Sequence, residues 1–95
     1  MEIKIEEWNG YKIRFVEIDG EWWAVAKDVA KALAYRDSND MTKRMESDEV
    51  ASFNWKKKQT EQYAGCFQDY KYKAEVPIIS EFGIYEAILN NGGSK

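Results

Sequence analysis

The 95 residues have room for one small domain, and a composition of 44% hydrophobic and 15% aromatic residues favours a folded over a disordered chain. With no histidine and a single cysteine, Cys66, the chain lacks the base of a serine or cysteine nucleophile, the ligands of a structural zinc site and the partner for an internal disulfide, so we expect neither an enzyme nor a metal or other cofactor. The net charge is −3. The absence of an apolar run of membrane-spanning length and a start without the features of a secretory signal predict a cytoplasmic protein with no membrane contact.

The first third of the chain predicts an antiparallel meander. The runs EEWNGYKIRF and VEIDGEWWAV each place an Asn-Gly or Asp-Gly pair between strand-like segments, which favours hairpins with two-residue turns. A two-residue turn at Asn9-Gly10 sets three cross-strand pairs, which are Trp8 with Tyr11, Glu7 with Lys12, and Ile5 with Arg14.

Two helices are expected next. The run AKDVAKALAYRD loses the alternation of a strand and gains an apolar stripe at helical spacing, with an acidic residue in its first turn: Val29, Ala32 and Leu33, with Asp28. The run SNDMTKRME predicts a second, short helix that Ser38 or Asn39 caps.

From Val50 the apolar spacing returns to two, which predicts a long hairpin around Ala64-Gly65. Its alternating residues are Phe53 and Trp55 on the first strand and Tyr70, Tyr72, Ala74, Val76 and Ile78 on the second. The only proline, Pro77, suits an edge position because it has no N–H for a second neighbouring strand.

A last helix is expected in SEFGIYEAILNN. Ser80 is its predicted cap, Asn91-Gly92 its end, and its predicted inward stripe is Phe82, Tyr85, Ile88 and Leu89. The chain therefore predicts a single α+β domain over residues 1–91, with a meander, a long hairpin and two to three short helices, followed by a flexible tail at 92–95.

The predicted hairpin gathers lysines on one face. If both strands are regular, Lys56 and Lys58 share the face opposite the aromatic residues with Lys71 and Lys73. Two interpretations remain open, a charged edge that prevents aggregation and a surface that contacts phosphates. Lys43 and Arg44, on the second helix, either add to a basic surface or form an ordinary solvated face.

The order of these motifs resembles the BRO family N-terminal domain, which occurs in phage and prophage antirepressors and in proteins of large DNA viruses. Two separated segments carry the resemblance, which covers most of residues 11–91: GEWWAVAKDVAKALAY and VPIISEFGIYEAILNN. The matching positions are Ala26, Lys27, Asp28, Val29, Leu33 and Tyr35 in the first, and Ser80, Glu81, Gly83 and Tyr85 in the second. We expect most of them to be structural: Asp28 as a helix-start charge, Gly83 for close packing and Tyr85 buried.

This chain also departs from the family pattern. Ala34 stands where glycine is usual and Phe82 where proline is common, and the chain ends before a segment that usually follows the last helix. An apolar patch near Ile84, Ile88 and Leu89 is then expected to be exposed, and we expect a second copy to cover it.

The resemblance implies a regulatory domain that binds DNA. The predicted contacts are Lys56, Lys58, Lys71, Lys73, Lys43 and Arg44. The alternative is a protein-interaction module that binds a repressor or another phage or host regulatory protein without contacting DNA. Exposed tryptophans among Trp8, Trp22 and Trp23 favour this alternative, and the acidic net charge weakens the case for DNA.

Overall fold

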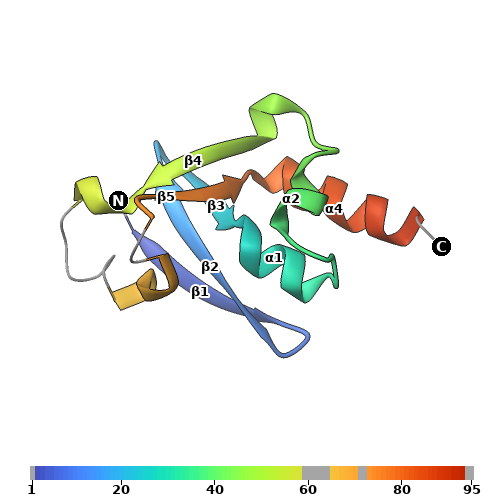
Figure 1. The fold of residues 1–95 in the computed structure, drawn as a ribbon, viewed down its shortest axis with the longest axis horizontal. Helices are drawn as coiled ribbons and strands as arrows, with labels where there is room; N and C mark the ends of the chain where they lie inside the picture. The colour runs from blue at the N-terminus through green and yellow to red at the C-terminus, as the bar shows by residue number, and fades with distance from the viewer. Residues whose placement is uncertain (1, 59–64, 71–72, 94–95) are drawn as a thin grey trace.

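A computed structural model describes residues 2–58, 65–70 and 73–93 (Figure 1). It has an α+β fold, as predicted, with five strands and three α-helices among these residues: β1 Ile3–Trp8, β2 Tyr11–Ile18, β3 Glu21–Val25, α1 Ala26–Ala32, α2 Ser38–Thr42, β4 Val50–Asn54, β5 Glu75–Ile79 and α4 Glu81–Gly93. Short 3-10 helices cover Ser47–Glu49, Trp55–Lys58 and Gln68–Tyr70. No helix in this part of the chain is long and apolar enough to cross a membrane.

The strands form one antiparallel sheet in the order β1-β2-β3-β5-β4. Both predicted two-residue turns are confirmed, because φ is positive at each of their residues: 51° and 84° at Asn9-Gly10, 53° and 81° at Asp19-Gly20. Positive φ at both positions is what a type I′ turn requires, and Asn, Asp and Gly tolerate it best. The three predicted cross-strand pairs of β1 with β2 follow from the first turn and are confirmed.

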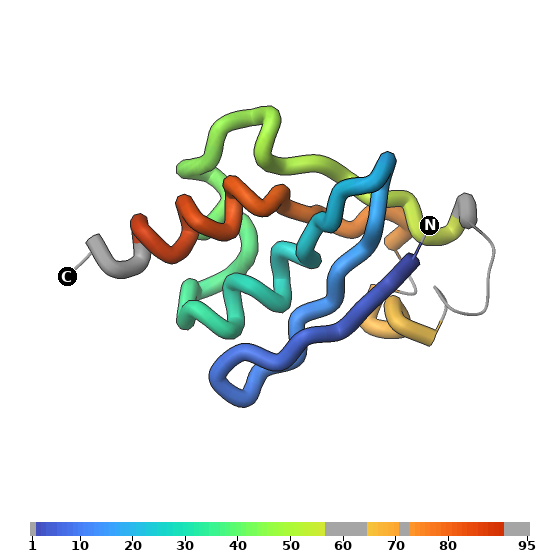
Figure 2. Tube along the Cα trace, turned by 180° about the vertical axis from the view of Figure 1, so that it is seen from behind, coloured from blue at the N-terminus to red at the C-terminus, as the bar shows by residue number. Residues whose placement is uncertain are grey.

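The sheet buries apolar side chains on both faces. One face packs Ile13, Phe15, Ala24 and Ile79 against the helices, around Val29, Met41 and Ile84. The other face packs Val16, Val25, Val76 and Ile78 against Phe53 and Phe67. Figures 1 and 2 show α1, α2 and α4 together at one end of the molecule and the segment of residues 65–70 at the opposite end.

Helix α1 ends earlier than its predicted apolar stripe. The backbone N–H of Ala34 donates to Lys31 O (3.2 Å) and that of Tyr35 to Ala30 O (2.9 Å), while Ala34 has φ 65°. This pattern is a Schellman motif, whose left-handed residue is usually glycine. It explains in physical terms why the family usually has glycine where this chain has Ala34.

Helix α2 begins at Ser38, but its cap is neither of the two predicted residues. The Asp37 carboxylate accepts from the backbone N–H of Asp40 at 2.8 Å, so the prediction of Ser38 or Asn39 as cap is wrong by one residue. The position before the helix has the extended backbone that a side-chain cap needs, and Asp37 occupies it.

Helix α4 has the predicted cap and the opposite buried face. The Ser80 hydroxyl oxygen accepts from the backbone N–H of Gly83 at 3.1 Å, which confirms the cap. The predicted inward stripe is wrong, because Phe82, Tyr85, Ile88 and Leu89 are 70%, 54%, 46% and 72% exposed. Small residues face the sheet instead: a Cβ at Gly83 would lie 3.2 Å from Ile79 Cβ and 3.3 Å from Glu49 O. Gly83 therefore permits the close packing that the sequence predicted for it.

The pairing of β4 with β5 confirms the strands of the predicted hairpin, but these strands are shorter than predicted. Ala64 of the predicted turn and Tyr72 of the second strand lie outside the described residues, so the turn stays a prediction. The chain turns into a 3-10 helix at Trp55, and Tyr70 lies in another. The Trp55 ring stacks on the buried Phe67 ring at 6.2 Å, beside the Phe53 ring, whose centre lies 5.9 Å from that of Phe67. Pro77 lies in β5, which is not an edge strand because β3 and β4 flank it. At Pro77 itself, however, only β4 pairs with the chain, because the pairing with β3 covers Ile78 and Ile79 alone.

Candidate functional site

Two of the predicted DNA-contacting lysines flank Trp55 at the end of the β4–β5 pair. The Lys56 ammonium lies 5.7 Å from the centre of the Trp55 ring, and the Trp55 indole N–H donates to Lys73 O at 3.0 Å. Lys56 and Lys73 are both exposed, and no ion pair joins either to a carboxylate of the described residues. The indole thus links two lysines that are distant in sequence, through the ammonium group of Lys56 and the backbone carbonyl of Lys73.

The other two lysines of the predicted face are not placed by this arrangement. Lys71 lies outside the described residues, and of Lys58 only the backbone is described, in the 3-10 helix. Strand parity therefore does not assign Lys56 and Lys58 to one face of a ribbon, because neither lies in a strand. The chain leaves the strand at Trp55 and enters a 3-10 helix, so the alternation predicted from the sequence does not continue through the lysines.

Lys43 and Arg44 form a separate basic pair. They follow α2, before β4, whereas Lys56 follows β4, and Figure 1 places α2 and the 3-10 helix of Lys56 at opposite ends of the sheet. The Lys43 ammonium is 3.1 Å from Asp40 Oδ1, and the hydrogen bond from Lys43 lowers the pKa of Asp40. The structure thus does not unite this pair with the lysines around Trp55.

The end of the molecule that carries Trp55 is held by a network around Arg14, which the sequence did not single out. The Arg14 guanidinium donates to Asp28 Oδ2 and Oδ1 (2.7 and 2.9 Å), to Asp69 Oδ1 and Oδ2 (2.9 and 3.1 Å) and to Cys66 O (2.8 Å). It also lies 5.3 Å from the ring centre of Phe67, on which Trp55 stacks. Phe67, which supports Trp55, therefore lies in a segment that charge-assisted hydrogen bonds to Cys66 O and Asp69 hold in place.

Asp28 has a larger part than the helix-start charge that the sequence predicted. Its Oδ2 also accepts from the backbone N–H of Arg14 at 2.9 Å, next to the last residue pair of β2 with β3. The carboxylate thus continues the hydrogen bonding of β2 where the neighbouring chain turns from strand into α1. The signal for this network was the Lys27-Asp28 pair of the family motif, since the Lys27 ammonium contacts Asp69 at 3.0 Å.

Charge pairing sets the ionisation of this network. Burial would raise the pKa of Asp69, but hydrogen bonds and charge from Arg14 and Lys27 outweigh it and lower that pKa to about 2. Burial also disfavours the charged form of Arg14, and the two carboxylates outweigh it and raise the pKa of Arg14. Arg14 and Asp69 therefore stay charged at neutral pH and have a structural role.

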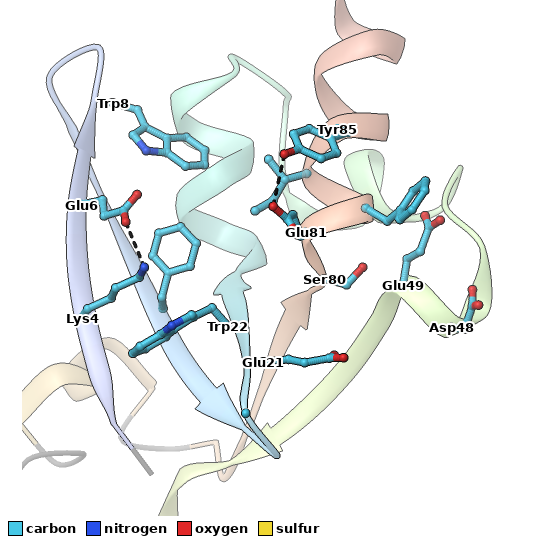
Figure 3. A pocket seen from close by; sticks show the side chains of 14 residues that line it. Lys4, Glu6, Trp8, Glu21, Trp22, Asp48, Glu49, Ser80, Glu81 and Tyr85 are labelled. Atoms are coloured by element: carbon cyan, nitrogen blue, oxygen red, sulfur yellow. Dashed lines mark hydrogen bonds and ion pairs between the residues drawn. The ribbon is translucent and has the colours of Figure 1, made fainter.

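A second site candidate is an acidic and aromatic groove of about 870 Å³ between the meander and α4 (Figure 3). Its carboxylates are Glu6, Glu21, Asp48, Glu49 and Glu81, and its large apolar side chains are Trp8, Phe15, Trp22, Phe82, Ile84 and Tyr85. Lys4 is its one basic residue. Despite these carboxylates, no group of three or more potential ligands within the described ranges could hold a metal ion.

The sequence singled out Trp8 and Trp22 for the protein-binding alternative, but it did not indicate the groove that they line. A signal was present in β1, where Lys4, Glu6 and Trp8 alternate and therefore share one face of the strand. The remaining walls come from the second hairpin turn, from the 3-10 helix Ser47–Glu49 and from α4, which only the fold brings together. The family motif predicted a buried Tyr85, but Tyr85 lines the groove instead. Its hydroxyl donates to Glu81 Oε2 at 3.2 Å.

Comparison with known proteins gives one match. Residues 12–92 match the family model described as BRO family, N-terminal domain. The match contains both segments that carry the resemblance in the sequence. Searches of curated proteins and of solved structures found no match.

Proposed function

This chain belongs to the BRO family through its N-terminal domain, and on that premise we propose that it is a regulatory domain of the antirepressor type that binds duplex DNA through the lysines around Trp55. The observation that carries the proposal is the position of Lys56 and Lys73, two exposed lysines that contact one indole, Lys56 through its ammonium group and Lys73 through its backbone carbonyl. Cations that are not already paired are the groups that release counterions when they meet phosphates. Lys58 and Lys71 adjoin them in the sequence and are proposed to extend the same contact.

Charge distribution supports this orientation on DNA. The chain has a net charge of −3, so a duplex meets overall repulsion unless a local basic surface faces it. The acidic groove lies with the residues that pack on the helix side of the sheet, whereas Trp55 packs with the core on the other side. DNA at the Trp55 end therefore avoids the groove carboxylates.

A salt titration of binding to random duplex DNA tests the proposal. If Lys56, Lys58, Lys71 and Lys73 all contact phosphates, log affinity falls with log salt at a slope of about −3 to −4. The double variant Lys56→Gln/Lys73→Gln removes two of the four proposed phosphate contacts and should make that slope shallower by about 2. Circular dichroism is expected to stay unchanged, since both side chains are exposed.

The double variant Lys43→Gln/Arg44→Gln is the matched control, because it removes the same charge from the opposite end of β4. Its separation from Trp55 predicts a smaller change of slope. An equal change would assign Lys43 and Arg44 to the DNA contact as well. Unmutated protein that fails to bind duplex DNA at low salt would overturn the proposal.

We also propose that the domain self-associates through the exposed end of α4. Ile88 and Leu89 are 46% and 72% exposed on one helix, whereas Ile84, which was predicted to belong to the patch, is buried. Adjacent exposed apolar side chains of this size favour a contact between copies.

A further inference from the structure

The acidic groove carries an inference that is independent of DNA binding. Its described lining holds five carboxylates and one ammonium group, beside two indoles and a phenol. Figure 3 shows Trp8 and Trp22 on the meander side, Tyr85 and Glu81 on the α4 side, and Glu21 between them at one end. Carboxylates beside aromatic faces are a suitable environment for a cation, because the ring faces and the carboxylates both attract positive charge.

Lys4 is a cation of this protein that already binds to such rings and to a carboxylate. Its ammonium group lies 4.5 Å from the ring centre of Trp22, 5.2 Å from that of Phe15 and 3.1 Å from Glu6 Oε2. One cation is thus held by one part of the groove. Glu21, Asp48 and Glu81 are exposed and make no ion pair with a cation in the described part of the chain.

Glu49 is an independent sign that a ligand is missing from the groove. The residue is only 9% exposed, and its buried Oε1 has no hydrogen-bond partner among the described residues. A buried carboxylate oxygen without a partner is unfavourable. Burial, together with a side-chain hydrogen bond to Glu86 and the charge of that carboxylate, raises the pKa of Glu49. A donor that enters the groove beside Phe82 would relieve this cost.

The apolar part of the groove continues onto the exposed surface of α4. Phe82 and Tyr85 line the groove and are 70% and 54% exposed. A ligand that carries only charge would leave these rings in water, whereas a segment with alternating basic and apolar side chains would cover them. The charge and the shape of the surface therefore select the same kind of partner.

We propose that this groove binds a basic amphipathic segment of a partner protein, with lysine or arginine side chains among Glu21, Asp48, Glu49 and Glu81 and apolar side chains on Phe82 and Tyr85. Charge complementarity decides in favour of this occupant over nucleic acid, which the carboxylates repel. It also decides against a second copy in the groove, since each copy is net acidic. The site and the lysines around Trp55 pack against different faces of the sheet, so the two functions are separable.

The test uses a short amphipathic helical peptide of lysine and leucine as the probe, with two matched peptides in which glutamate replaces lysine or serine replaces leucine. Binding is followed by nitrogen-15 NMR of the four indole N–H groups. Trp8 and Trp22 line the groove, while Trp23 and Trp55 pack with the other core and serve as internal controls. We expect the lysine-leucine peptide to shift the Trp8 and Trp22 signals and both matched peptides to bind much more weakly.

The variant Glu21→Gln/Glu81→Gln keeps the shape of the groove and removes two of its charges. It should weaken peptide binding about tenfold, since exposed charge pairs contribute up to about 1 kcal/mol each. The matched control is Glu7→Gln/Glu75→Gln, which removes the same charge from exposed positions outside the groove. It should leave the affinity within about twofold, which is the limit for surface charges without a partner.

Three outcomes would overturn the proposal. The first is that the glutamate peptide binds as well as the lysine peptide, and the second is that the shifts occur at Trp23 and Trp55 instead. The third is that the two double variants weaken binding equally. If Trp8 and Trp22 shift with protein concentration alone and the peptide has no further effect, a second copy fills the groove. Because the groove variants retain Lys56 and Lys73, we expect their DNA affinity to be retained. A failure of peptide binding can therefore be distinguished from a failure of DNA binding.

Discussion

Arg14 uses five hydrogen bonds from one guanidinium group to join three segments of the chain. Asp28 belongs to α1, whereas Asp69 and Cys66 belong to the segment under the sheet, so the arginine connects residues that are 14, 52 and 55 positions apart. A lysine could not make the same contacts, because an ammonium group has three donors and cannot bind two carboxylates through two parallel hydrogen bonds each. The geometry thus explains why an arginine stands on this strand.

Asp69 makes the pH dependence of this network testable. Its pKa of about 2 in the folded protein is below the value of about 3.9 for an unfolded aspartate, so its contribution to stability is complete above about pH 5 and is lost as the pH falls toward 2. Asp69→Asn should lower the free energy of unfolding by about 1 to 2 kcal/mol at pH 7. The difference from the unmutated protein should shrink between about pH 4 and pH 2.

Denaturant unfolding at several pH values measures this difference. Glu2→Gln, an exposed carboxylate outside the network, serves as the control and should change stability by less than about 0.5 kcal/mol. A constant difference between Asp69→Asn and the unmutated protein from pH 7 to pH 2 would contradict the assigned role of the carboxylate.

The end of α1 is an element whose sequence and geometry disagree. A left-handed conformation costs a non-glycine residue about 1 to 2 kcal/mol, and Ala34 adopts it with φ 65° to close the Schellman motif. Ala34→Gly removes that conformational cost from the folded state. Part of the resulting stabilisation is offset because glycine has more conformational freedom in the unfolded chain. We expect a net gain of about 1 kcal/mol in the free energy of unfolding.

The same substitution two residues earlier should have the opposite sign. Ala32 is the last residue of α1, so Ala32→Gly should cost up to about 1 kcal/mol, since glycine disfavours helical backbone. Thermal or denaturant unfolding of both variants checks the pair. Destabilisation by Ala34→Gly would mean that the backbone at this position is not left-handed.

Helix α4 shows how packing selects a helix face. Hydrophobicity favours burial of Phe82, Tyr85, Ile88 and Leu89, yet the helix docks through Gly83, Ile84 and Ala87. Gly83 allows the backbone to approach β5 and the end of the Ser47–Glu49 helix closely, and the Tyr35 hydroxyl donates to Ala87 O at 2.6 Å. Small residues thus set the contact, and the large apolar residues are left for other partners.

For the whole molecule, the outward face of α4 predicts association between copies. We expect the average mass in light scattering to rise with protein concentration in the micromolar range. Leu89→Glu places a charge in this contact on both copies and should weaken the association about tenfold or more. Ile88 and Leu89 do not line the groove, so peptide binding there should persist in this variant.

Gln68→Glu adds the same charge at an exposed position at the other end of the molecule and should leave the association unchanged. A monomeric mass of the unmutated protein over the whole concentration range would contradict the prediction. Equal effects of Leu89→Glu and Gln68→Glu would assign any association to net charge rather than to α4.

The sequence by itself determined the features that neighbouring residues control. Asn9-Gly10 and Asp19-Gly20 prefer positive φ, so they fixed two turns and, through them, the register of the meander. Ser80 capped α4 because its hydroxyl needs only an N–H three residues away. The family motifs were recognisable for the same reason, since they are short patterns of this local kind.

Only the tertiary structure decided which distant residues meet. The first strand of the hairpin ended at Asn54, where a 3-10 helix begins, and the close approach of Gly83 to β5 left the larger side chains of α4 exposed. Arg14 found partners up to 55 residues away, and the groove took its walls from β1, the second turn, a 3-10 helix and α4. Such contacts depend on how whole elements fit together, because the free energy of close packing and of buried charge is shared by residues that no local pattern relates.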